Sequence, residues 1–151
     1  MAANTAGVAN SFKLDLLVGS SGSLVHNFVT GGGDTFKMAL YLINESITPT
    51  TTAYTATGEV PNTGTYAAGG SALAMKTPAA SANSVLVDAN VASIGWTGMT
   101  SAAFDTALLY NSSKSNKAVA VYNFGSQTIT AGALTLTMPA SGVGTSLLEL
   151  D

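Results

Sequence analysis

The sequence has no arginine, no cysteine and little charge of either sign. Only 9% of its 151 residues are Asp, Glu, Lys or Arg, against about 25% in a typical globular domain. Without cysteine there is no disulfide, thiolate metal ligand or cysteine nucleophile. Five scattered lysines and no arginine also make direct nucleic-acid binding an unfavourable hypothesis. Such a neutral surface favours a repeated structural part over a freely diffusing enzyme, although a binding module can share this composition.

Long hydrophobic runs are also missing, so the sequence predicts no membrane helix and no membrane partner. The first residues lack the basic and apolar regions of a secretory signal. The length and the 46% hydrophobic content suit one folded domain. We expect a flexible N-terminal arm of small residues over 1–10 and a single β domain over 11–151.

Apolar and polar residues alternate with a period of two in several segments, which predicts strands with one face on a core. The pattern is clearest at 12–16, 36–42 and 134–138, and a short helix competes only at 103–109. Weaker patterns predict further strands at 24–29, 53–59, 72–75, 84–88, 104–111, 118–124, 127–130 and 145–150. About eight to ten short strands, separated by Gly, Pro, Asn and Ser clusters, predict an all-β, single-domain β-sandwich that is jelly-roll-like.

Residues that could carry catalysis are sparse. His26 is the only histidine, and no Gly-x-Ser-x-Gly motif accompanies it. The carboxylates are not paired by their spacing, and no His-carboxylate cluster predicts a metal site. The glycine run at 31–33 lacks the Gly-Lys-Ser/Thr of a phosphate-binding loop and predicts a hairpin turn. We therefore expect no catalytic residue, no cofactor and no metal, with His26 in a structural or exposed position.

Partner contacts are the remaining candidates. Trp96 could stack on a sugar ring, but a single Trp beside glycines is more often a core or interface anchor. The polar stretch 44–52 predicts an extended loop or an edge with which another chain could pair. Together with the arm, these segments provide the candidate contact residues Ala2, Asn4, Val8, Asn44, Ile47, Thr50 and Trp96.

Two parts of the chain carry a resemblance to a known family. The first is Thr-Phe-Lys-Met-Ala-Leu-Tyr-Leu at 35–42, followed by the segments 51–60 and 66–70. The second is the segment 107–125, which contains Tyr-Asn-Ser-Ser-Lys-Ser-Asn-Lys. In this order, the segments resemble small virion structural proteins of tailed bacteriophages, of the head decoration or cement type.

That resemblance implies a non-enzymatic part of the virion, assembled in the cytoplasm of a host bacterium. It implies a capsid decoration protein that binds and stabilises the lattice of the major capsid protein. A homo-oligomer is expected, with a trimer favoured and a dimer as the other choice. The alternative is a tail or neck component, or a receptor-binding module that recognises glycan. A hydrolase ranks last, because its general base would have to be His26.

Overall fold

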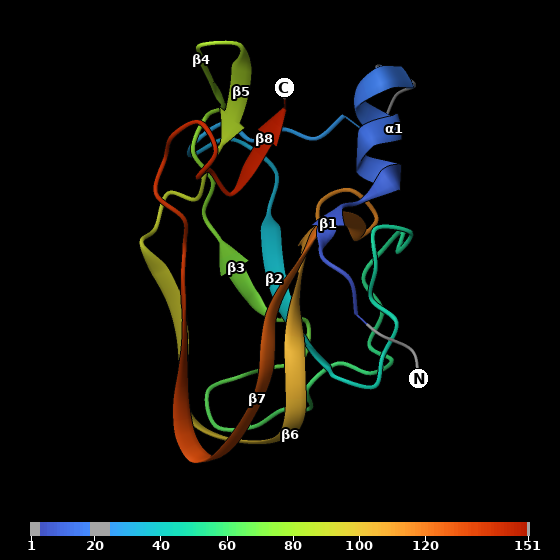
Figure 1. The fold of residues 1–151 in the computed structure, drawn as a ribbon, viewed down its shortest axis with the longest axis vertical. Coiled ribbons are helices and arrows are strands. Elements are labelled where there is room, and N and C mark those ends of the chain that lie inside the picture. The colour runs from blue at the N-terminus through green and yellow to red at the C-terminus, as the bar shows by residue number, and fades with distance from the viewer. Residues whose placement is uncertain (1–3, 19–24, 151) are drawn as a thin grey trace.

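The computed structural model describes residues 4–18 and 25–150 of the chain. They form a mostly β structure with two antiparallel sheets, consistent with the predicted all-β sandwich (Figure 1). The five-stranded sheet has the order β1-β7-β6-β2-β3, and the three-stranded sheet has the order β4-β5-β8. The elements are β1 (Gly7–Val8), α1 (Asn10–Val18), β2 (Phe36–Leu42), β3 (Ser71–Leu73), β4 (Ala79–Ser81), β5 (Ser84–Val87), β6 (Ser93–Asn111), β7 (Lys117–Thr137) and β8 (Leu148–Leu150).

One long hairpin, β6 and β7, dominates the larger sheet. Its strands have 19 and 21 residues, and Figure 1 shows both turning at the lower end of the molecule and running back up. The register shifts several times between Trp96 and Thr106, and Gly98 and Gly125 have positive φ. The segments 118–124, 127–130 and 134–138, expected as separate strands, therefore lie almost entirely in this single curved strand β7. Because this hairpin replaces a series of short strands, the jelly-roll expectation is not confirmed.

The core lies around β2, which pairs with β6 on one side and with β3 on the other. The predicted inward face of Phe36, Met38 and Leu40 is buried, as expected. Tyr41 on the opposite face is also buried. Strand β2 is thus covered on both faces, and only one of these faces followed from its alternation.

Leu40→Ala is expected to lower the free energy of unfolding by about 2–5 kcal/mol. The Leu40 side chain is 0% exposed, so truncation removes buried apolar area and leaves a cavity. Chemical denaturation measures the loss. Leu17→Ala is the matched control, because Leu17 is 85% exposed and its truncation should cost less than about 0.5 kcal/mol. Equal costs for the two variants would contradict the burial of Leu40.

The segment 12–16, expected as a strand, is wrong: it lies in helix α1. The alternation that favoured a strand put Phe12 and Leu14 on one face, whereas in the helix Phe12 is buried together with Asp15 and Leu14 is exposed. Leu and Lys are good helix formers, and Asn10 is a residue type favoured at helix starts. Five residues of apparent alternation are too few to outweigh these local preferences.

Three other expectations also need correction. Residues 25–29 of the segment expected as a strand at 24–29 have no regular secondary structure, and residue 24 lies outside the described residues. The segment 53–59 forms only isolated bridges, from Ala53 to Lys117 and from Glu59 to Tyr41. The short helix considered at 103–109 is instead part of β6.

The described part of the expected arm, residues 4–10, is built into the fold. Gly7 and Val8 of β1 pair with Val121 and Ala120 of β7. Ala9 is 0% exposed, and its amide donates to the Val119 carbonyl at 2.9 Å. This segment needs no partner to hold it, because β7 supplies its hydrogen bonds.

Candidate functional site

The predicted contact residues fall into three groups in the structure. Ala2 lies outside the described residues. Asn44 and Thr50 are exposed in the turns of the 44–52 loop. The others are buried or engaged within the chain: Asn4, Val8, Ile47 and Trp96. The structure therefore leaves Asn44 and Thr50 as the described candidates that are exposed to a partner.

Asn4 joins three segments of the chain. Its Nδ2 donates to Asp105 Oδ1 at 2.6 Å and to the Leu42 carbonyl at 3.1 Å. Its Oδ1 accepts from the Ile47 amide at 2.8 Å, and the Ile47 side chain is buried. The side chains predicted to reach a partner from the arm and from the loop thus hold these two segments to each other and to β6.

Trp96 is an internal anchor. Its side chain is 2% exposed, and its Nε1 donates to Ser71 Oγ at 2.8 Å. The indole also meets the Tyr66 ring edge-on, with 5.3 Å between the ring centroids. This position agrees with the core interpretation and leaves the ring without an exposed face for a sugar.

His26 is held in a buried polar cluster between helix α1 and the end of β6. Its Nδ1 lies 3.0 Å from Asn111 Nδ2, and its Nε2 lies 3.5 Å from Asp15 Oδ2. Because an amide nitrogen can only donate, this geometry assigns the proton to Nε2, facing the carboxylate. Both ring nitrogens are therefore engaged, and a role as general base would require one of these contacts to break.

The same cluster continues to a second carboxylate. Asn111 Nδ2 also donates to Asp34 Oδ2 at 2.8 Å, and Lys117 Nζ lies 3.5 Å from Asp15 Oδ2. Burial removes water from His26 and lowers its pKa below the ordinary value, although the Asp15 carboxylate opposes this shift. Residues 85 positions apart meet here, so spacing along the chain could not reveal the cluster. Its chemistry is that of a neutral structural imidazole.

His26→Gln is expected to weaken the pH dependence of stability below about pH 6.5. The lowered pKa means that the unfolded chain takes up a proton on His26 before the folded chain does, so this residue's contribution is complete above that pH and declines as the pH falls. Thermal unfolding of both proteins between about pH 7.5 and about pH 5 measures the effect. An unchanged slope in the variant would contradict the burial of a neutral His26.

A second buried cluster surrounds Glu59, whose carboxylate accepts three hydrogen bonds. Tyr54 and Tyr66 donate their hydroxyls to it at 2.6 and 2.7 Å, and the Gly69 amide donates at 2.7 Å. Burial first, and the Glu59 hydrogen bond next, raise the pKa of both tyrosines. All three donors are thereby matched, so this cluster stabilises the loop between β2 and β3.

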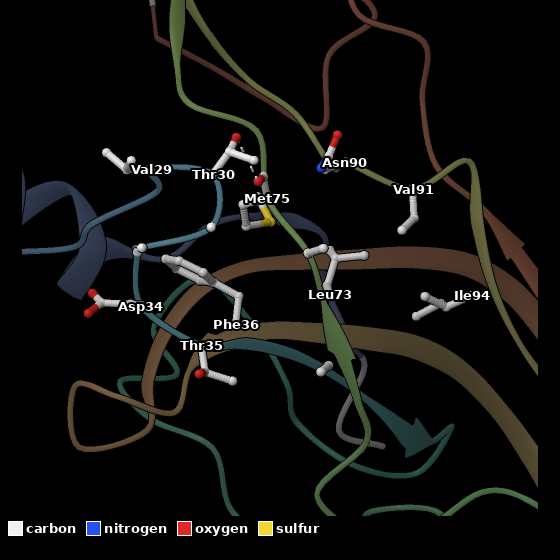
Figure 2. A pocket seen from close by; sticks show the side chains of 15 residues that line it. Val29, Thr30, Asp34, Thr35, Phe36, Leu73, Met75, Asn90, Val91 and Ile94 are labelled. Atoms are coloured by element: carbon white, nitrogen blue, oxygen red, sulfur yellow. Dashed lines mark hydrogen bonds between the residues drawn. The ribbon is translucent and has the colours of Figure 1, made fainter.

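The pocket in Figure 2 has a volume of about 380 Å³ and opens beside the turn at 31–33. Phe36, Leu73 and Met75 line it from β2 and the β3 segment, and Ile94 lies across from them on β6. Asp34 is the only charged residue among its lining. The predicted turn is confirmed: the Asp34 amide donates to the Asn27 carbonyl at 2.7 Å and closes it. With an apolar wall and one carboxylate, the pocket fits apolar side chains better than a phosphate.

Among residues 4–18 and 25–150, no group of three or more His, Asp or Glu side chains is placed to hold a metal ion. Within the same residues, no helix is long and apolar enough to cross a membrane. Comparison with known proteins finds no matching family model, no matching curated protein and no matching solved structure.

Proposed function

We propose that this chain is a non-enzymatic structural protein of a tailed-bacteriophage virion, which decorates the capsid and stabilises the lattice of the major capsid protein. The observation that carries the proposal is that the fold makes an already charge-poor surface still more neutral. Four of the eight acidic residues are buried: Asp15, Glu59, Asp88 and Asp105. The resemblance of the segments 35–70 and 107–125 to decoration proteins provides the identity of the partner.

A neutral surface suits binding to a repeated lattice. Each contact can be weak, because linked copies engage many sites and gain from effective concentration. Contacts between uncharged surfaces also lose little when salt is raised, since there is little Coulomb attraction to screen. We propose a homo-oligomer, with a trimer favoured over a dimer, as the form that matches capsid symmetry.

The alternative proposal is a tail or neck component, or a module that binds host glycan. The buried position of Trp96 removes the aromatic side chain that made glycan binding attractive. Tail and head locations differ in copy number, so quantitative mass spectrometry of purified particles separates them. We expect an abundance comparable to that of the major capsid protein, and only a few copies per particle would favour the tail.

Salt release tests the uncharged interface directly. Particles that carry the protein are washed at about 50 mM and about 500 mM NaCl, which shortens the Debye length about threefold. We expect nearly all of the protein to remain bound at both concentrations. Ready release at the higher concentration would overturn the proposed neutral contact. Deletion of residues 1–9 is a poor test of contact, because β1 and Ala9 are part of the fold.

A further inference from the structure

Helix α1 turns its acidic residue inward and its apolar residues outward. Phe12 and Asp15 are 1% and 7% exposed, whereas Leu14, Leu17 and Val18 are 57%, 85% and 60% exposed. These three residues have the i, i+3, i+4 spacing of a single helix face, and α1 stands at the margin of the molecule (Figure 1). The inward carboxylate is explained by Lys117 and His26. The outward apolar stripe has no such explanation within the described chain.

The pocket in Figure 2 is the concave counterpart of this stripe on the same chain. Its walls are mainly apolar, and Val91 at its margin is 36% exposed. A convex apolar helix face and an open apolar pocket both remain uncovered in the isolated chain. Water contact with either surface is unfavourable, so burying one in the other stabilises an assembly of copies.

We propose that helix α1 of one copy docks through Leu14, Leu17 and Val18 into the pocket of a second copy. The charges are complementary: Lys13 is the only exposed charged residue of α1, and Asp34 is the only charged residue that lines the pocket. The contact thus places apolar groups against apolar groups and opposite charges at its margin.

The size of the stripe favours this contact over a pair of α1 helices packed against each other. A nine-residue helix is only about 13 Å long, so two such stripes bury far less than the roughly 800 Å² per partner of a stable interface. In the proposed arrangement each copy contributes both its helix and its pocket. A head-to-tail contact of this kind forms closed rings when the rotation between copies allows it, and a ring of three matches the favoured trimer.

This inference refines the proposed homo-oligomer but does not require a capsid, so the isolated protein tests it. Size-exclusion chromatography with light scattering, over a range of concentrations, compares wild type with three variants. Leu17→Glu changes the helix, Val91→Glu changes the pocket, and Val143→Glu is the control, since Val143 is 55% exposed and outside both surfaces. We expect each of the first two to weaken self-association about tenfold or more, and the control to behave like wild type.

Mixing the two variants is the decisive step. The Leu17→Glu protein keeps an intact pocket, and the Val91→Glu protein keeps an intact helix, so the mixture should form a dimer that neither protein forms alone. Circular dichroism checks that the variants are folded, and Ala72→Glu, at another exposed pocket position, replaces Val91→Glu if that protein does not fold.

Three results would overturn the inference. The first is a wild-type protein that stays monomeric at every concentration. The second is unchanged self-association of the pocket variant, which would indicate an α1-to-α1 contact. The third is a mixture of variants that remains monomeric. None of these bears on retention of the protein by particles, so failure of this contact is distinguishable from failure of the proposed function.

Discussion

Glu59→Ala is expected to lower the free energy of unfolding by about 3 kcal/mol or more, because it leaves three buried donors without their acceptor at about 1–3 kcal/mol each. These donors are the hydroxyls of Tyr54 and Tyr66 and the amide of Gly69. The Glu59 side chain is in a residue that is only 7% exposed, so water cannot readily replace the carboxylate. Urea denaturation followed by tryptophan fluorescence measures the loss.

Two further variants separate the hydrogen bonds from the shape of the side chain. Tyr54→Phe removes one donor together with its need for an acceptor, and its cost should be about 1 kcal/mol. Glu59→Gln keeps the volume and one acceptor oxygen, so its cost should fall between those of Tyr54→Phe and Glu59→Ala. A Glu59→Ala protein as stable as wild type would show that this cluster does not contribute to stability.

Gly70→Ala is expected to cost more than about 3 kcal/mol, or to prevent folding, because two separate penalties coincide. The φ of Gly70 is +68°, a conformation that residues with a Cβ rarely adopt. A Cβ at this position would also overlap the Met38 carbonyl oxygen and would lie 2.7 Å from the Ala39 Cα. Strand β2 cannot move aside, since β6 and β3 hold it from both sides.

Gly125→Ala is the matched control for backbone conformation. Gly125 has a φ of +81°, but no atom lies within 4 Å of a Cβ built there. Its substitution should therefore cost only about 1 kcal/mol, the penalty for positive φ alone. Thermal unfolding of both variants measures the difference. Equal losses would show that the close approach of Gly70 to β2 does not constrain the fold.

Strand β2 shows what alternation can predict. Phe36, Met38 and Leu40 have the period of a half-buried strand, and their burial is confirmed. The same rule was wrong for α1, where the alternation of Phe12, Leu14 and Leu16 extends over only five residues and local helix preference prevails. It also divided β7 into three strands, because Gly125 and Ser126 read as a turn but are accommodated within one bent strand.

The candidate site was less predictable than the fold. The sequence shows one histidine, one tryptophan and scattered carboxylates, but it does not show that Asp15, His26 and Asn111 meet in one cluster. Nor does it show that Glu59 collects donors from two tyrosines and a glycine. Contacts of this kind join residues far apart along the chain, and only the packing of the elements brings them together.

The sequence by itself determined the β class, the neutral character of the surface and the absence of cysteine chemistry, because composition and a period of two are properties of neighbouring residues. The tertiary structure decided which charges are hidden, that Trp96 is an internal anchor, and that α1 presents Leu17 instead of Asp15 to the outside. These outcomes depend on long-range partners such as Lys117 and Ser71. A side chain's exposure is set by what packs against it, and local sequence does not contain that information.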